Sequence, residues 1–288
     1  MDTVIEFLKV LFLGLVEGIT EWLPISSTGH MLLVDEFLNL NESEDFKEVF
    51  FVVIQLGAIL AVLLLFWNKM FPFRLGEEAK RRGAVRFDVF SLWFKVVVAC
   101  IPGAVVTLLF DDPLEEFLHH TPVTESVSLM TVVIAATLIV YGFAFIFVEK
   151  KNEGKPRRVT SLSQITYRDA LLIGLFQVLS IIPGTSRSGS TIIGALILGI
   201  SRGAAAEFTF FLAVPVMAGY SLLKLLKFGL AFSGYQLFIL LTGCAAAFLT
   251  SLFVIRFLMA YVKKHSFSAF GWYRIALGCA VLLYFFVF

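Results

Sequence analysis

Long apolar runs separated by short polar loops make up most of the chain. Six runs are long enough to cross the roughly 30 Å of hydrocarbon in a bilayer, at about 48–67, 92–110, 126–148, 205–228, 236–262 and 267–288. Two further pairs of segments are interrupted or short: 4–23, which is apolar but contains Glu6, Lys9, Glu17 and Glu21, with 28–40, and 168–182 with 188–200. The first pair is broken at Pro24 and the second at Pro183 and Gly184. Two short, broken segments in a row predict a re-entrant helical hairpin. The pattern therefore predicts an all-α polytopic membrane protein with six transmembrane helices and two re-entrant hairpins.

The composition agrees with this fold class. The 288 residues are 59% hydrophobic and 16% charged, with a mean hydropathy of +0.90, whereas soluble domains average about 45–50% apolar and about 25% charged. We expect one integral membrane domain over residues 1–288.

A net charge of +1 and the lack of a basic patch with interleaved aromatics give no support for a nucleic-acid partner. The three cysteines lie in apolar runs without a CxxC pair, so no disulfide framework or zinc site is expected. Residues 1–16 lack the basic start and the cleavage site of a signal peptide.

Loop charges predict the orientation. Loops 68–91 and 149–169 each carry six lysine and arginine residues. Loop 111–125 carries five aspartate and glutamate residues and no lysine or arginine, and segment 35–48 is nearly as acidic. The positive-inside rule places the two basic loops in the cytoplasm. The acidic segments and the C-terminus are then external.

The two halves of the chain also resemble each other. Segment 14–29 aligns with segment 174–189 when one gap is placed before the proline, which pairs Pro24 with Pro183 and Ser27 with Ser186. Each hairpin precedes three spans, and the loop charges have the two hairpins entering from opposite sides. This predicts an inverted-topology repeat, with repeat one at about 1–150 and repeat two at about 165–288. In such proteins paired broken segments mark the binding site near the bilayer midplane.

The second hairpin break has the residues of an anion cradle. Pro183 and Gly184 should end one helix, and Ser186 or Ser188 can cap the next. A helix start directs free N–H groups and a positive dipole at a ligand, and the planar fork of Arg187 suits phosphate oxygens. The alternative is an arginine that snorkels to the headgroups. Substrate contacts in this segment are predicted for Gly184, Thr185, Ser186 and Ser188.

The first hairpin carries carboxylates, hydroxyls and a histidine. Glu17 and Glu21 are four residues apart and share one helical face, where a divalent cation, an arginine or a shared proton must relieve their repulsion. The alternative is a helix lying flat in the interface with both carboxylates in water. The hydroxyls of Ser26, Ser27 and Thr28 precede His30, and Ser26 and Thr28 are predicted to contact the substrate. A hydroxyl or imidazole nucleophile beside a carboxylate and facing an arginine indicates phosphoryl transfer. His119, His120 and His265 are expected to be solvated.

These motifs, Glu17-xxx-Glu21 with Pro24-x-Ser-Ser-Thr-Gly-His30 and Pro183-Gly-Thr-Ser-Arg-Ser-Gly189, resemble those of the bacterial undecaprenyl-diphosphate phosphatase family, which is also known for bacitracin resistance. The resemblance covers nearly the whole chain. It implies six transmembrane helices with two re-entrant hairpins, a multi-pass protein of the bacterial plasma membrane, and hydrolysis at the outer face. It also implies a divalent cation, Mg²⁺ or Ca²⁺, and recycling of the lipid carrier for cell-wall synthesis. The active site carried over by the resemblance consists of Glu17, Glu21, Ser27, His30 and Arg187.

The residues leave several points open. The polyprenyl tail can stay among the membrane lipids while the diphosphate enters the polar pocket, but either water or Ser27 can attack the phosphorus. Glu17 and Glu21 can be metal ligands, bases, or one of each. A secondary transporter or channel for an anionic solute is the alternative function, because inverted repeats with broken helices also suit transport. A type-2 phosphatidic-acid phosphatase is disfavoured, because Arg187 is not followed by the histidine and aspartate of that class. The oligomeric state is open, with a homodimer as one alternative.

Overall fold

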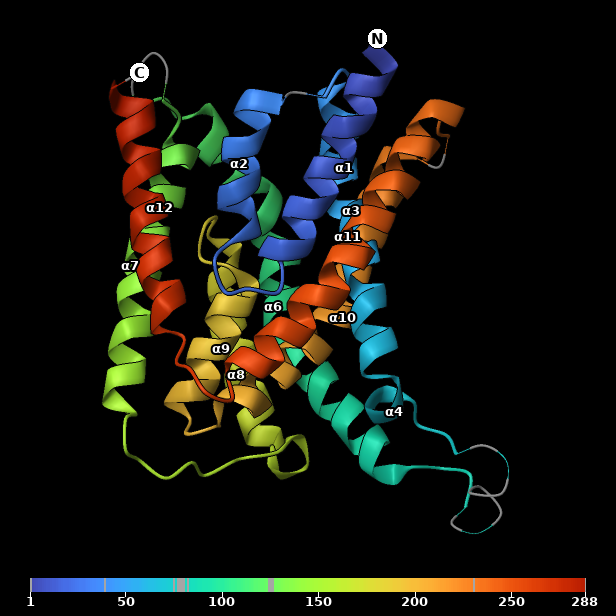
Figure 1. The fold of residues 1–288 in the computed structure, drawn as a ribbon, viewed down its shortest axis with the longest axis vertical. Coiled ribbons are helices and arrows are strands. Elements are labelled where there is room, and N and C mark those ends of the chain that lie inside the picture. The colour runs from blue at the N-terminus through green and yellow to red at the C-terminus, as the bar shows by residue number, and fades with distance from the viewer. Residues whose placement is uncertain are drawn as a thin grey trace.

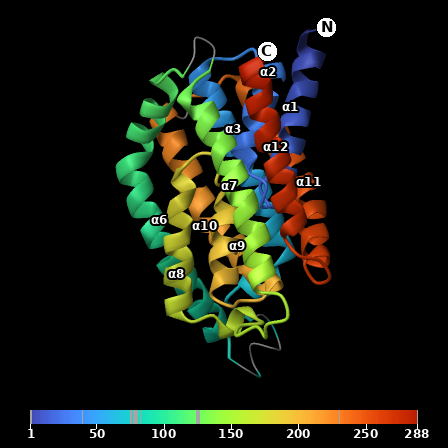
Figure 2. The same cartoon turned by 90° about the vertical axis from the view of Figure 1, so that its left-hand side faces the viewer.

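The computed structural model describes residues 2–38, 40–74, 76, 81, 83–123, 127–229 and 231–287, and these residues fold almost entirely as helices (Figures 1 and 2). The helices are α1 (Asp2–Thr20), α2 (Ser27–Leu38), α3 (Glu44–Leu65), α4 (Trp67–Met70), α6 (Phe87–His120), α7 (Leu129–Lys151), α8 (Tyr167–Val178), α9 (Arg187–Ile197), α10 (Arg202–Phe228), α11 (Gly234–Tyr261) and α12 (Ser268–Val287). Two 3₁₀ turns, η1 (Leu162–Gln164) and η2 (Leu179–Ile181), adjoin the ends of α8.

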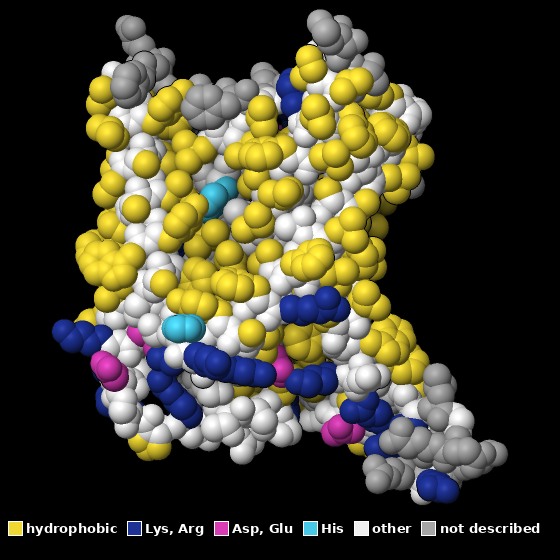
Figure 3. All heavy atoms as spheres, in the orientation of Figure 1, with side chains coloured by type: hydrophobic (Ala, Val, Ile, Leu, Met, Phe, Trp, Pro, Cys, Tyr) yellow, Lys and Arg dark blue, Asp and Glu magenta, His cyan; other side chains and the backbone are white. Residues whose placement is uncertain are grey.

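Six of the helices are long and apolar enough to cross a membrane, and they confirm the six predicted spans. They are α3, α6 over Phe87–Asp111, α7, α10, α11 and α12. Hydrophobic side chains cover the middle of the face shown in Figure 3, and lysine and arginine side chains gather towards the lower end. The basic loop that joins α7 to α8 lies at this same end (Figure 1).

The four remaining long segments form two pairs inside the bundle. Helices α1 and α2 meet at a turn halfway down the molecule, and both have their outer ends at the top of Figure 1. Helices α8 and α9 also meet at an internal turn, but their outer ends are at the bottom. The turns of the two pairs are the positions where the sequence predicted helix breaks. Each turn thus delivers polar residues to the interior of an otherwise apolar bundle.

Helix α6 differs from its prediction. Residues 92–110 were expected as a span and 111–125 as an external loop, whereas α6 is continuous from Phe87 to His120 and contains Pro102 and Pro113. A proline removes one helical hydrogen bond, and membrane helices tolerate this because neighbouring groups satisfy the freed carbonyl. Most of the expected loop is therefore helical, and Glu125 lies outside the described residues.

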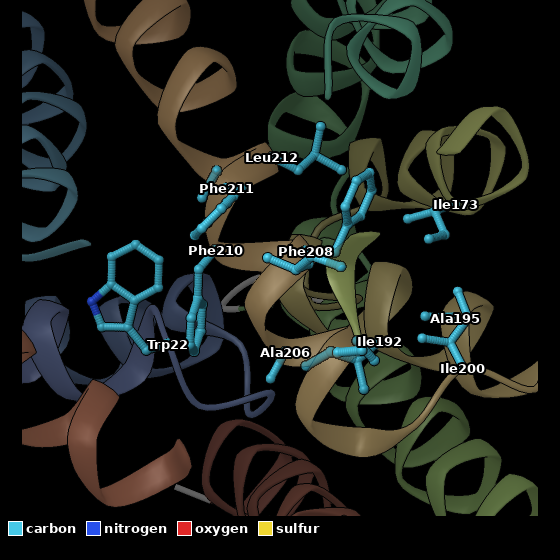
Figure 4. Close-up of a cluster of buried hydrophobic side chains, with 14 of the residues drawn as sticks. Trp22, Ile173, Ile192, Ala195, Ile200, Ala206, Phe208, Phe210, Phe211 and Leu212 are labelled. Atoms are coloured by element: carbon cyan, nitrogen blue, oxygen red, sulfur yellow. The ribbon is translucent and has the colours of Figure 1, made fainter. Parts of the chain in front are cut away.

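The largest apolar core lies around α10 and fixes the first hairpin turn. Trp22, which directly follows Glu21, is fully buried and meets Phe210 of α10 edge to face, with 5.3 Å between ring centroids. Figure 4 shows Trp22 and Phe210 facing each other beside the other side chains of this cluster. Within a bilayer such contacts stabilise helix association through close van der Waals packing. The core therefore holds the turn of the first hairpin against α10.

Two ion pairs tie elements together at the end that carries the basic loops. Arg202 at the start of α10 makes a forked contact with Glu149 of α7, at 2.6–3.1 Å. Arg158, in the segment that precedes α8, pairs with Asp169 at 2.5 Å. Burial favours the neutral form of Asp169, but hydrogen bonds from Arg158 and Thr166 outweigh it and hold the pKa of the carboxyl below its ordinary value.

Candidate active site

The first hairpin turn is closed by a serine in an unusual backbone conformation. Helix α1 ends at Thr20 and α2 begins at Ser27. Between them Ser26 has a φ of +74°, which non-glycine residues adopt rarely and at a cost of about 1–3 kcal/mol. The Ser26 hydroxyl accepts a hydrogen bond from the Gly29 N–H at 3.3 Å. The hydroxyl therefore caps the start of α2, and its hydrogen bond is made within the turn.

The second turn is built in the same way. Ser186 has a φ of +70° and its hydroxyl accepts from the Gly189 N–H at 3.2 Å, which confirms the prediction of a cap at Ser186. Ser26 and Ser186 are the two non-glycine residues of positive φ in the described chain. The two caps are Ser26 and Ser186, whereas the alignment of the sequence paired Ser27 with Ser186, so matching the caps shifts that alignment by one residue. Ser27 then corresponds to Arg187, and each is the first residue of its helix.

Ser27 and Arg187, which begin α2 and α9, both bind Glu21. Arg187 Nη2 donates to Glu21 Oε1 at 2.5 Å, and the Ser27 hydroxyl donates to Glu21 Oε2 at 3.0 Å. The Ser188 hydroxyl reaches the Glu21 backbone carbonyl at 3.3 Å. Only 12% of the Arg187 side chain and 9% of the Glu21 side chain are exposed. Arg187 therefore does not snorkel, and it compensates the Glu21 charge by a charge-assisted hydrogen bond.

Among the described residues, one acceptor and one donor close to Glu21 are buried without a hydrogen-bond partner. Glu17 is only 1% exposed, so the alternative in which both carboxylates lie in water is wrong. Its Oε1 atom is buried without a hydrogen bond, and so is Arg187 Nη1. Buried polar groups nearly always have a partner, so an acceptor and a donor are left available for a ligand.

The carboxylates suit a hard cation only in combination with a ligand. Among the described residues no group of three or more His, Cys, Asp or Glu side chains is placed to hold a metal. Both Glu21 oxygens already accept hydrogen bonds, which leaves Glu17 Oε1 as the unpartnered carboxylate oxygen. Mg²⁺ is commonly held by one or two carboxylates together with substrate phosphate oxygens and water. The donor set therefore fits a divalent cation that binds together with a phosphate-bearing substrate.

His30 lies on the other side of the first turn. Its Nδ1 atom is 2.7 Å from the Ser26 carbonyl oxygen, and its Nε2 atom is 2.7 Å from the Tyr273 hydroxyl of α12. The described part of the chain shows no hydrogen bond from His30 to Glu17 or Glu21. The structure thus brings His30 to the same turn as Ser27, with its ring directed at α12.

The other predicted residues take different positions. Thr28 is exposed, and no hydrogen bond among the described residues joins it to the rest of the site. The Thr185 hydroxyl is turned inward and donates to the Ile182 carbonyl at 2.8 Å. His265 is exposed, as predicted, and stacks on Tyr261, whereas the side chains of His119 and His120 lie outside the described set.

Arg274 of α12 is a site residue that sequence reasoning missed. It is 0% exposed and donates from Nη1 to the Pro24 carbonyl at 3.0 Å. From Nη2 it donates to the carbonyls of Gly184 and Thr185 at 2.6 and 2.8 Å. One guanidinium thereby joins both hairpin turns. A lone arginine within an otherwise apolar span is a signal of such a role.

The fold and the site together define a polytopic helical membrane protein whose two internal hairpin turns meet in a buried cluster of arginine, carboxylate and hydroxyl groups. Comparison with known proteins agrees with this class. The family described as bacitracin resistance protein BacA matches residues 10–280, and this chain belongs to that family.

Individual relatives are similar over almost their whole length. The chain is 62% identical to an undecaprenyl-diphosphatase of Enterococcus faecalis over 279 residues, which is 97% of each protein. It is 58% identical to an undecaprenyl-diphosphatase of Lachnoclostridium phytofermentans, with 98% of this chain and 97% of the relative covered. It is 54% identical to undecaprenyl-diphosphatase 1 of Clostridium acetobutylicum, with 98% of both chains covered.

Proposed function

We propose that this protein hydrolyses undecaprenyl diphosphate to undecaprenyl phosphate and inorganic phosphate. The observation that carries the proposal is the convergence of Ser27 and Arg187, from two different hairpins, on the carboxylate of Glu21. The unpartnered Arg187 Nη1 atom can donate to a phosphate oxygen, and the unpartnered Glu17 Oε1 atom can accept from a water molecule or bind a cation at the phosphate. Family membership and the names of the similar proteins support the same reaction.

The cluster suggests a division of roles. Arg187 binds the diphosphate through Nη1 while Nη2 holds Glu21 in place. Glu21 accepts the Ser27 proton if the hydroxyl attacks, or the proton of an attacking water. In both cases a new P–O bond forms at the terminal phosphorus, and the bond to the bridging oxygen breaks. The electron pair of that bond leaves with undecaprenyl phosphate. A phosphoserine formed by Ser27 is then hydrolysed by water.

A divalent cation, Mg²⁺ or Ca²⁺, is part of the proposal. Glu17 would hold it through Oε1, and Glu21 through a second lone pair of an oxygen that already accepts a hydrogen bond. Together with the diphosphate they would bind the cation, which would neutralise the charge of the substrate. The polyprenyl tail would remain among the membrane lipids.

We infer that the two hairpins are re-entrant and that the halves are inverted repeats. Three pairs of equivalent features, each offset by 160 residues, support this. The caps Ser26 and Ser186 and the Glu21-binding residues Ser27 and Arg187 are two of these pairs. The third is a pair of close helix contacts. A Cβ atom at Gly14 of α1 would meet the Gly243 carbonyl of α11, and one at Gly174 of α8 would meet the Ala99 carbonyl of α6.

The orientation of the site is tested with single cysteines in a background that lacks Cys100, Cys244 and Cys279. An impermeant thiol reagent applied to intact cells should label a cysteine at exposed Val123, which follows α6. It should not label cysteines at Gly83 or Lys155, in the basic loops. The first hairpin would then open outward, so that the diphosphate enters from the external face of the plasma membrane. Labelling at Gly83 or Lys155 would contradict this orientation.

The reaction itself is tested with purified protein in detergent and a long-chain polyprenyl diphosphate. Released phosphate is measured with added Mg²⁺, with added Ca²⁺ and with a chelator. We expect release in the presence of cation and little in the presence of chelator. No phosphate release, combined with uptake of an anionic solute by reconstituted vesicles, would instead indicate the transporter.

A further inference from the structure

His30 occupies both of its ring nitrogens with protein partners. The Ser26 carbonyl, 2.7 Å from Nδ1, can only accept, so Nδ1 carries a proton. In the neutral ring Nε2 is then an acceptor, and the Tyr273 hydroxyl at 2.7 Å is its donor. The two rings are parallel within 3°. In this arrangement neither nitrogen is free to attack phosphorus.

The contact is repeated in the other half of the molecule. His30 is the fourth residue of α2, and Ser190 is the fourth residue of α9. The Ser190 hydroxyl donates a hydrogen bond to the hydroxyl of Tyr141, on α7, at 3.0 Å. Helices α7 and α12 pack against each other, and each supplies one tyrosine hydroxyl to the start of one inner helix. A tyrosine hydroxyl therefore contacts the fourth residue of the inner helix at both turns, and this residue is a histidine at the first turn and a serine at the second.

The contact between Tyr273 and His30 is linked through Ser26 to the hydrogen bond between Ser27 and Glu21. His30 holds the carbonyl of Ser26, whose positive φ is strained. The next residue, Ser27, donates to Glu21. A rotation of the Ser26 peptide would move the Ser27 hydroxyl away from that carboxylate. Tyr273 itself is 45% exposed, and among the described residues its hydroxyl makes no hydrogen bond to Glu21 or Arg187.

We infer that Tyr273 is a positioning residue, which fixes the His30 ring in its Nδ1–H tautomer so that His30 holds the Ser26–Ser27 peptide in register with Glu21. His30 is then a support for the site and not its nucleophile. The kinetic consequence rests on the proposed phosphatase function, whereas the hydrogen-bond arrangement does not.

The first test reads the tautomer directly. The full-length protein is labelled with ¹⁵N in its histidine rings, and long-range ¹H–¹⁵N spectra are recorded in detergent at neutral pH. The His30 signal is assigned by its loss in His30→Gln. We expect a proton on Nδ1 of the wild type, and in Tyr273→Phe a shift of the Nε2 resonance towards that of an unbonded nitrogen. A wild-type proton on Nε2, or identical spectra for the two proteins, would overturn the inference.

The second test is a kinetic cycle. The loss of one neutral hydrogen bond corresponds to about a three- to tenfold effect, so Tyr273→Phe should lower kcat by that factor with KM changed less than about twofold. In a His30→Gln background the same change should have no further effect, because Tyr273 acts through His30. Tyr235→Phe, at another partly exposed tyrosine of a spanning helix, is the matched control and should keep wild-type kinetics.

Additive losses in the cycle, or wild-type kcat in Tyr273→Phe, would also overturn the inference. If the wild-type protein releases no phosphate from any polyprenyl diphosphate, the proposed function fails, and the tautomer spectra alone then decide whether Tyr273 positions His30.

Discussion

Replacing Arg187 by lysine tests whether its two terminal nitrogens have separate tasks. In the structure Nη2 is 2.5 Å from Glu21 Oε1, and Nη1 is buried without a partner. A lysine keeps the positive charge but offers one nitrogen on an unbranched stem. That nitrogen can neutralise Glu21 or bind the diphosphate, but it cannot do both in the geometry of the planar fork. We therefore expect Arg187→Lys to fold and to lose its transition-state contact.

The expected loss follows from the number of donors removed. Removing one preorganised donor from a transition-state site costs about 10²–10³ in kcat, or about 2.7–4 kcal/mol. Lysine is preferable to alanine here, because deleting one partner of a buried ion pair destabilises a protein by about 3–5 kcal/mol. An alanine variant would then confuse unfolding with loss of catalysis.

The assay measures phosphate release at saturating polyprenyl diphosphate, together with thermal unfolding in the same detergent. Arg202→Lys is the matched control, since Arg202 makes a comparable forked contact with Glu149 outside the candidate site. It should lower the unfolding temperature slightly and leave kcat unchanged. A kcat for Arg187→Lys within about threefold of the wild type would refute the separate tasks and leave Arg187 as a structural partner of Glu21.

Further changes test cation binding, the bridge that Arg274 forms between the two turns, and the stability of the fold at acid pH. Glu17→Gln should weaken the apparent Mg²⁺ affinity at least tenfold in a titration of phosphate release, because an amide oxygen is a poorer ligand than a carboxylate; unchanged affinity with lost turnover would make Glu17 a proton carrier. Arg274→Lys should lower the unfolding temperature and the activity, because each buried carbonyl that loses its donor costs about 1–3 kcal/mol. Asp169, whose pKa is lowered chiefly by Arg158 against the effect of burial, stabilises the fold above its unfolded pKa of about 3.9 and loses this contribution as pH falls through the lower folded value. Asp169→Asn should therefore flatten the acid limb of thermal unfolding measured below about pH 4, and an unchanged limb would contradict this.

Features that depend on local sequence could be predicted. The break at Pro183, the cap at Ser186 and the six spans follow from short-range rules on proline, capping and hydrophobic length. The two helix breaks could be predicted, but the residue that caps the helix after the first break could not. Ser26 and Ser27 are adjacent and chemically identical, and the structure is needed to show that Ser26, with its positive φ and its hydrogen bond from the Gly29 N–H, caps the helix.

The contribution of α12 could not be predicted, because it depends on contacts between residues far apart in the chain. Arg256 and Arg274 both lie in apolar spans, and a hydrophobic pattern treats them alike. In the structure Arg256 is exposed and Arg274 is fully buried. Which of the two points inward depends on the rotation of each helix, and that rotation is set by packing against α3 and α1 for α11, and against α7 for α12.

The clamp by Arg274 explains how two separate hairpins can share one chemical centre. Glu21 and Arg187 come from different halves of the chain, and their 2.5 Å contact requires the two turns to keep a fixed separation. Arg274 of α12 bridges the two turns, because one of its terminal nitrogens donates to the Pro24 carbonyl and the other donates to the Gly184 carbonyl. A fully buried guanidinium costs several kcal/mol to desolvate, and apolar packing alone would seal the bundle without it. What apolar packing cannot provide is directional contact with carbonyls on both turns at once, and this contact is what holds the two half-sites in register.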